Sequence, residues 1–195
     1  FDAPSPGSLA PWWARYGHSV DIVNAMDNSG GSIELMILIG GFAPNPMNDI
    51  WLSHDSNCWN FSGHAPFSPR AWHSTVTFKG KLLVLGGTPL VNDVWQLNSL
   101  KILDDGMFEL DWTMLVEKAE WSPRVGAGAT VLKSSNDSNI FLMGGFAGWP
   151  RDDPKWDGER SRNDIWVSSE GISWQRLLEE APWSPRGWHS LVTWR

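Results

Sequence analysis

The stretch WSPRGWHSLVTW, residues 183–194, decides the fold because related stretches occur three times earlier in the chain. They read FSPRAWHSTVTF at 67–78, WSPRVGAGATVL at 121–132 and WWARYGHSV at 12–20. The arginines of the four copies are 55, 54 and 62 residues apart (70 − 15, 124 − 70 and 186 − 124). A period of this size is typical of architectures in which each repeat is one small supersecondary unit.

In chain order, each of the first three copies, at 12–20, 67–78 and 121–132, is followed by the same series of features. An apolar run ends in a Gly pair, an Asn-Asp-x-Trp motif comes next, and a second Trp follows. The Gly pairs end at 41, 87 and 145, the motifs occupy 48–51, 92–95 and 163–166, and the second Trp stands at 59, 112 and 174. The spacing within the motif and from the second Trp to the next Arg hardly varies, whereas the other distances do. Rigid segments separated by variable ones indicate strands and loops, so the pattern predicts a four-stranded antiparallel blade for each unit.

A meander of about 50 residues with these features is one blade of a β-propeller, an all-β fold. The Gly pair, the spaced aromatic residues and the PR-x-x-H opening resemble the repeats of kelch proteins over essentially the whole chain. We expect the tail of a preceding unit at 1–14, blades at 15–66, 67–120 and 121–182, and the first strand of another blade at 183–195. This is a partial kelch-type propeller. A piece of a longer protein is favoured over a ring completed by copies or by partner chains.

The composition agrees with many short strands and turns, because the 195 residues include 15 Trp, 19 Gly and 13 Pro but one Tyr. The net charge of −7, without basic clusters, argues against nucleic acid as a partner. No apolar run reaches the length needed for membrane insertion. The single Cys58 cannot form an internal disulfide, and no compartment or cofactor is indicated.

The repeated Arg is the first candidate binding group. Arg15, Arg70, Arg124 and Arg186 are predicted to lie at one mouth of the central channel, where guanidinium groups could grip carboxylates or an acidic peptide. The alternative, favoured because the residue recurs at equivalent positions, is that each Arg bonds backbone carbonyls or a nearby Asp and ties blades together.

The other repeated polar residues are interpreted as structural. Asp49, Asp93 and Asp164 are expected to cap backbone N–H groups at turns. His18, His73 and His189 lack metal-ligand spacing, so no metal site is predicted.

Most Trp residues are expected to pack between blades, but four break the regular pattern. Trp72 and Trp188 stand next to a His near the predicted mouth, and Trp149 and Trp156 belong to an insertion at 148–162. Exposed Trp on loops is typical of recognition surfaces. Two sequons, at Asn60 and Asn136, are candidate N-glycosylation sites.

The leading hypothesis is a non-catalytic module for protein interaction or assembly, with a protein partner or further blades bound at the loop face. Carbohydrate binding through Trp72, Trp149 and Trp188 is the first alternative. Because kelch-like propellers include copper radical oxidases and sugar-acid isomerases, the resemblance also implies an enzymatic alternative. An oxidase would need Tyr ligands, and this sequence offers only Tyr16, whereas an isomerase with Arg and His facing the channel stays open.

Overall fold

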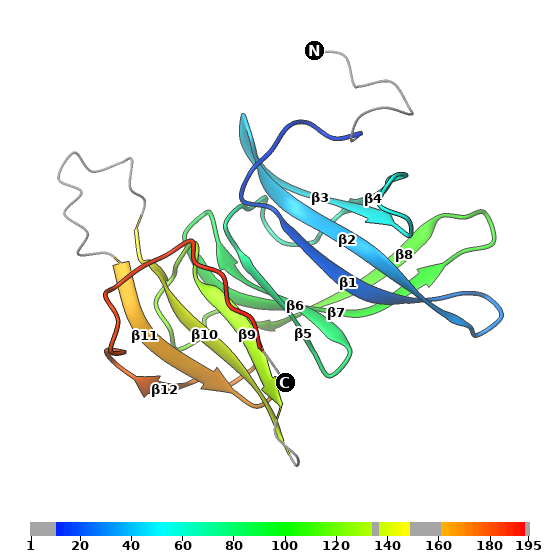
Figure 1. Ribbon diagram of the computed structural model, residues 1–195. Coiled ribbons are helices and arrows are strands. Elements are labelled where there is room, and N and C mark those ends of the chain that lie inside the picture. Colours follow the sequence, from blue (N-terminus) through cyan, green and yellow to red (C-terminus); the bar gives the residue numbers. More distant parts are fainter. Residues whose placement is uncertain (1–10, 134–136, 149–160, 194–195) are drawn as a thin grey trace.

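The computed structural model describes residues 11–133, 137–148 and 161–193, and the regular structure of this part is β throughout (Figure 1). In these ranges no helix is long and apolar enough to cross a membrane. The strands follow one another as three antiparallel meanders. Their bounds are β1 (Ser19–Met26), β2 (Ser32–Ala43), β3 (Asn45–Ser53) and β4 (Asn60–His64); β5 (Ser74–Phe78), β6 (Lys81–Gly87), β7 (Val91–Ile102) and β8 (Phe108–Val116); and β9 (Gly128–Lys133), β10 (Ser138–Phe146), β11 (Ser161–Ser168) and β12 (Gln175–Leu178).

Each meander forms one blade in which every strand pairs with the next strand of the chain. We name them blade 1 (β1–β4), blade 2 (β5–β8) and blade 3 (β9–β12). One parallel bridge, between Met26 and Lys101, joins the ends of blades 1 and 2. The first strands of the blades contact one another, β1 with β5 and β5 with β9, so they form the inner wall of a partial β-propeller (Figure 1).

The hydrophobic core lies between the blades. Leu82 and Val84 of β6 belong to a cluster with buried residues of blade 1, whereas Leu83 and Leu85 belong to a cluster with buried residues of blade 3. Because successive side chains of a strand point to opposite faces, a strand covered on both faces is apolar at every position. This explains the unbroken run LLVL at 82–85. Full burial of each such side chain contributes about 1.5–3 kcal/mol.

The predicted Trp pairs of blades 2 and 3 pack against these two clusters. Trp95 and Trp112 lie against the first cluster. Trp174 is buried in the second cluster, and Trp166 packs against it. The expectation that these four residues fill the space between blades is therefore confirmed.

The Gly pairs adopt backbone conformations that other residues rarely take. In blade 2, φ is +62° at Gly86 and +100° at Gly87, and the pairs of the other blades have similar values. A Cβ on Gly87 would lie 2.9 Å from the carbonyl oxygen of Ala71, just before β5 of the same blade. Left-handed conformation and this close approach together explain why Gly stands here.

Residues 183–193 were predicted to belong to a strand, and the structure assigns none to them. β1, β5 and β9 each pair with the second strand of their own blade, and residues 190–193 have no such partner in the described part of the chain. The segment nevertheless follows blade 3, since Leu191 lies against Gly128 of β9.

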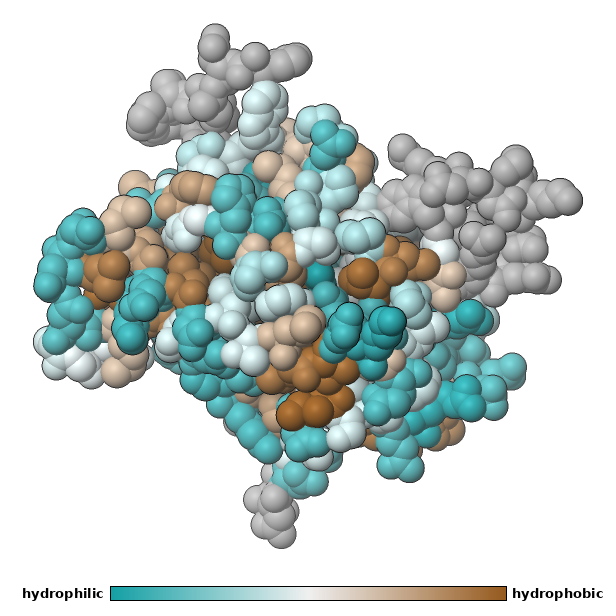
Figure 2. Space-filling view, turned by 180° about the vertical axis from the view of Figure 1, so that it is seen from behind, coloured by the Kyte–Doolittle hydropathy of each residue, from teal (hydrophilic) through white to brown (hydrophobic). Residues whose placement is uncertain are grey.

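The molecular surface seen from behind carries a compact apolar patch near its centre, bordered by hydrophilic residues (Figure 2).

Candidate functional site

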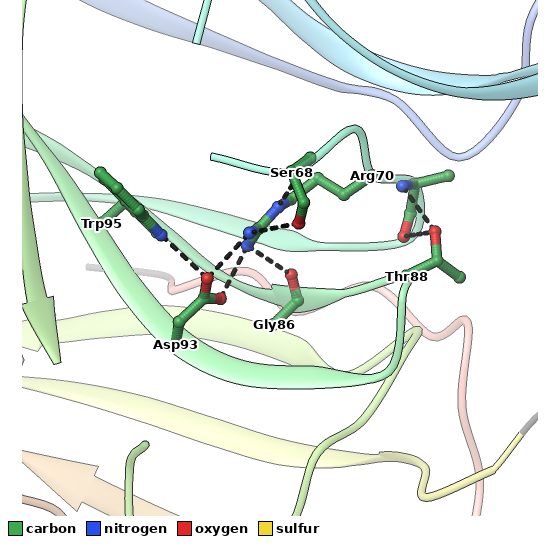
Figure 3. A network of polar contacts seen from close by, with 7 residues as sticks. Ser68, Arg70, Gly86, Thr88, Asp93 and Trp95 are labelled. Carbon is green, nitrogen blue, oxygen red and sulfur yellow. Dashed lines mark hydrogen bonds and ion pairs between the residues drawn. The ribbon is translucent and has the colours of Figure 1, made fainter. Parts of the chain in front are cut away.

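Arg70 occupies a buried polar site at the start of blade 2 (Figure 3). Its side chain is 1% exposed. Nη1 and Nη2 donate to the two carboxylate oxygens of Asp93, both at 2.8 Å, and Nη1 also donates to the carbonyl of Gly86 at 3.0 Å. The indole N–H of Trp95 donates to the same carboxylate at 2.9 Å. The guanidinium charge is thus neutralised inside the blade by a bidentate pair, the strong form of this interaction.

The same site recurs in the other two blades. Arg15 binds Asp49 at 2.6 and 2.8 Å, and Arg124 binds Asp164 at 2.7 and 2.8 Å. Burial alone would raise the pKa of Asp49 and of Asp164. Hydrogen bonds from the Arg and from the nearby Trp indole, together with the Arg charge, outweigh burial and hold both pKa values below the ordinary value.

The prediction that the three Asp side chains cap turns is therefore wrong. They lie 34, 23 and 40 residues after their Arg partners, and their oxygens accept mainly from guanidinium and indole donors. An unpaired buried guanidinium raises the free energy of the folded protein far more than a backbone N–H that is exposed to water. The Asp side chains therefore pair with the Arg residues instead of capping turns.

The backbone of each internal Arg binds the preceding blade while its side chain binds the following one. Arg70 N–H donates to the Met47 carbonyl at 2.8 Å, and its own carbonyl accepts from Gly41 N–H at 2.9 Å. Arg124 makes the equivalent bonds to Val91 and Gly87. These arginines join neighbouring blades, and 1% exposure leaves their side chains little surface for an external ligand.

Arg186 differs from the other three arginines. Its backbone is bound to blade 3 in the same way, through Arg162 and Gly145. Its side chain is exposed, and it donates from Nε to the Ser184 carbonyl at 3.1 Å and from Nη2 to the Ser184 hydroxyl at 3.0 Å. No carboxylate pairs with it among the residues that the structure describes. Within those residues, Arg186 is thus the one repeated Arg with an open guanidinium edge.

A chain of backbone hydrogen bonds runs from blade to blade through the residues that precede the inner strands. Trp72 N–H donates to Gly17 at 2.7 Å, Gly126 N–H donates to Trp72 at 2.8 Å, and Trp188 N–H donates to Gly126 at 2.8 Å. These four residues each stand two positions after the repeated Arg, and their φ values lie between +53° and +67°. A left-handed Trp is rare, and such conformations persist only where the surroundings hold them.

Gly and Trp alternate in this chain of bonds for a steric reason. A Cβ on Gly17 would lie 3.0 Å from the indole of Trp72, and a Cβ on Gly126 would lie 2.6 Å from the indole of Trp188. Each indole therefore covers the Gly of the preceding blade, and the position below it has no room for a side chain.

The indoles of Trp72 and Trp188 contact other aromatic side chains. Tyr16, Phe42 and Trp72 form one cluster with ring centroids 5.5 Å apart in all three pairs. Phe146 and Trp188 form a second, with centroids 4.5 Å apart. Tyr16 is 51% exposed and Trp188 is 55% exposed. We call these five residues the mouth surface, after the channel mouth that the sequence predicts beside the repeated Arg.

Sequence reasoning found two of the five, Trp72 and Trp188, and missed Tyr16, Phe42 and Phe146. A signal for the latter was present, because Tyr16 directly follows the repeated Arg and each Phe directly follows a Gly pair. Trp149, Trp156 and the sequon at Asn136 lie outside the described residues. Asn60, at the start of the edge strand β4, is exposed.

His73 lies between blades 1 and 2, where its Nε2 is 3.0 Å from the hydroxyl of Ser19. Burial, the charge of Arg70 and the charge of His18 lower its pKa to about 3. His73 is therefore neutral in the folded protein near pH 7.

The inner strands and the segment 191–193 line a cavity of about 430 Å³ with several Thr side chains and Asp21. Burial raises the pKa of Asp21, and a hydrogen bond with Thr75 partly offsets this. The cavity is thus polar, and its acidic group belongs to blade 1.

The comparisons with known proteins agree on a fold rather than on a function. No family model matches the chain. It is 28% identical over 177 residues to Host cell factor 1 of Homo sapiens and 27% identical over 177 residues to that of Rattus norvegicus, covering 82% of this chain in each case. The alignments cover 8% of those proteins, so the chain spans less than a tenth of the curated relatives it matches.

A solved structure extends this comparison. YjhT is similar with a TM-score of 0.56 and 16% sequence identity, covering 95% of this chain and 59% of YjhT. At this identity the likeness concerns the fold. Together with the three antiparallel blades, it identifies the chain as an all-β, partial β-propeller.

Proposed function

We propose that the chain is a sector of a kelch-type propeller and acts as a protein-interaction module through its mouth surface. The repeated motifs, the similarity to Host cell factor 1 and the likeness to YjhT support the kelch-type propeller. The mouth surface supports the interaction role.

The observation that carries the proposal is the placement of Trp72 and Trp188. Both hold a left-handed conformation, which costs an L-residue about 1–2 kcal/mol. Gly fills the equivalent position in the other two copies without that cost. Trp188 keeps this unfavourable conformation although more than half of its surface is exposed. Packing inside the protein therefore offsets only part of the conformational cost. Strained residues of this kind cluster at ligand-binding sites.

The chemistry of the mouth surface fits a peptide with apolar or aromatic side chains. The arginines of the three blades are neutralised internally, so their charge does not dominate this face. Tyr and Trp supply large contact area, each with a polar group that can bond a peptide backbone. Affinity would come from a few such aromatic residues rather than from charge.

The test compares proteins captured from an extract of the source organism by the wild-type chain and by two variants. Tyr16→Ala with Trp188→Ala removes the two most exposed rings of the mouth surface. Phe61→Ala removes a 49% exposed ring on β4 and serves as the matched control. We expect quantitative mass spectrometry to show partners that the double variant loses and the control keeps. Equal recovery by all three proteins would move the interaction to another surface.

Carbohydrate binding is the second candidate, because an exposed indole face such as that of Trp188 also stacks on sugar rings. A glycan array with wild-type protein and Trp188→Ala separates the two functions. A signal that depends on Trp188 would favour carbohydrate over protein. The isomerase alternative gains no support from this site, since Arg70 is paired with Asp93 and His73 is buried and neutral.

A further inference from the structure

The outer strands of the three blades differ in length and regularity. β8 has 9 residues, whereas β4 has 5 and β12 has 4. From Phe108 to Met114 every residue of β8 has a partner in β7, while the pairing of β4 with β3 is interrupted between Asp49 and Trp51. Short and irregular edge strands resist pairing with other chains, so β8 is the least protected of these three edges.

β8 belongs to a long hairpin with β7 (Figure 1). The hairpin is closed by hydrogen bonds from Leu103 N–H to the Met107 carbonyl and from Gly106 N–H to the Leu103 carbonyl. Within the part of the chain that the structure describes, β8 pairs with β7 and with no other strand. Its second edge therefore presents backbone N–H and carbonyl groups that can bind an added strand.

The two faces of β8 differ in chemistry. Phe108, Leu110 and Trp112 pack against the core cluster between blades 1 and 2. Glu109 and Asp111 alternate with them and are exposed. Because successive side chains of a strand point to opposite faces, β8 has an apolar face toward blade 1 and an acidic face toward solvent.

A groove of about 410 Å³ lies between β8 and the outer strand β4 of blade 1. Leu110 and Trp112 line it from blade 2, and Ser62 and Gly63 line it from blade 1. A Cβ on Gly63 would have no other atom within 4 Å, so no neighbouring side chain closes this wall. A strand paired with β8 would point every second side chain toward this groove.

The hairpin is acidic. Residues 98–111 contain one basic residue, Lys101, and four carboxylates: Asp104, Asp105, Glu109 and Asp111. Lys101 pairs with Glu109 at 3.5 Å, whereas Asp111 accepts a hydrogen bond from the uncharged Asn98 at 3.1 Å. Among the described residues no basic side chain pairs with Asp111, so the acidic face of β8 favours a partner with basic groups.

A second copy of β8 is a poor partner for this edge. Antiparallel pairing centred on Leu110 would place Glu109 of each copy opposite Asp111 of the other, and parallel pairing in register would place each carboxylate opposite its counterpart. Like charges directly opposite each other destabilise a sheet. The strand that fits must therefore come from a different chain.

We propose that residues 108–113 of β8 are a docking edge for an extended segment of a protein partner in which basic and apolar residues alternate. The segment adds a strand to blade 2, its apolar side chains enter the groove, and its basic side chains lie opposite Glu109 and Asp111. Main-chain hydrogen bonds supply affinity in this mode of recognition, and the alternate side chains supply specificity. The docking edge shares no residue with the mouth surface, and the inference does not depend on the proposed function.

The probe is the hexapeptide Lys-Val-Lys-Val-Lys-Val with blocked ends. Lys-Lys-Lys-Val-Val-Val has the same composition and charge but does not place all Lys on one face, so it is the control. In NMR titrations of the isotope-labelled chain we expect the amide signals of 108–113 to shift, with at least about threefold tighter binding of the alternating peptide. Hydrogen exchange should slow at every second residue of the docking edge, because only alternate N–H groups of an edge strand face away from its partner.

A charge reversal tests the acidic face. Asp111→Lys should weaken binding of the alternating Lys peptide by at least about threefold, because an attractive cross-strand pair becomes repulsive. The same variant should bind Glu-Val-Glu-Val-Glu-Val more tightly than the wild type does. Glu34→Lys, which makes the same change in net charge at an exposed residue of β2, is the matched control and should bind both peptides as the wild type does.

Three results would overturn the proposal. Equal affinity for the alternating and the block peptide would mean attraction by charge without strand pairing. An equal effect of Asp111→Lys and Glu34→Lys would mean that the position of the carboxylate is irrelevant. Protection of the docking edge that rises with protein concentration in the absence of peptide would assign this edge to a second copy of the chain.

Discussion

Replacing Asp93 by Asn tests whether the buried Arg–Asp pair holds blades 1 and 2 together. The amide keeps the shape of the carboxylate but removes the charge opposite the Arg70 guanidinium, whose side chain is 1% exposed. Hydrogen bonds from Arg70 to Ser68 and Gly86 remain, and they carry no compensating charge. Removing one partner of a buried pair typically costs about 3–5 kcal/mol. That is a large part of the total, since domains are stable by about 5–15 kcal/mol.

Urea unfolding followed by Trp fluorescence at about pH 7 measures this cost. With a slope of about 2 kcal/mol per molar urea, the midpoint should fall by roughly 1.5–2.5 M. Asp111→Asn, the same chemical change at an exposed residue of β8, should shift the free energy of unfolding by less than about 0.5 kcal/mol. Asp93→Leu combined with Arg70→Met should recover part of the loss, because no buried charge is then left unpaired. A single Asp93→Asn variant as stable as Asp111→Asn would refute the reasoning.

Two further predictions concern glycine geometry and pH. Gly87→Ala should destabilise the protein by about 1 kcal/mol or more beyond Gly63→Ala in urea unfolding, because φ is +100° and +99° at the two positions but only a Cβ on Gly87 meets backbone within 3 Å. Equal losses would mean that the close approach to Ala71 is relieved at no cost. His73 has a folded pKa of about 3 against 6.5 in the unfolded chain, so the unfolded state binds the proton first as pH falls below 6.5. The contribution of His73 to stability should be complete above that pH and about 2 kcal/mol lower at about pH 5, so His73→Gln should make the pH dependence shallower; a pH profile unchanged by the substitution would contradict it.

The carboxylates titrate in a different window. The folded pKa values of Asp49 and Asp164 lie below the ordinary value of 3.8, so their contribution is present above that pH and is lost as pH falls through the folded pKa values. Loss of stability between pH 6.5 and 3.8 is therefore assigned to the histidines whose pKa burial lowers, His73 together with His18 and His189. The pairs of Asp49 with Arg15 and of Asp164 with Arg124 add to the loss at lower pH.

The blades were predictable from sequence because their signals are local. The run LLVL at 82–85, the Gly pairs and the Asn-Asp-x-Trp motifs each report a strand or its end within a few residues. The Asp side chains were assigned to turns instead of to the Arg residues, because the partners stand 23–40 residues apart and Asp also fits a local turn role. The left-handed Trp72 and Trp188 were equally hidden, since sequence patterns assign a positive φ to Gly and not to Trp.

The structure separates two roles within the stretch that opens each blade. The Arg is present in every copy, and in the three blades its charge is paired with a buried Asp. Its role there is structural. The two residues that follow it vary, as Tyr16-Gly17, Ala71-Trp72, Val125-Gly126 and Gly187-Trp188, while their backbone keeps one left-handed hydrogen-bonding pattern. Side chains on a constant backbone can change without loss of the fold, which is the condition for a recognition surface. Trp188→Gly should therefore leave the bond to Gly126 in place, as hydrogen exchange at residue 188 would report, while it removes most of the exposed ring area around Phe146.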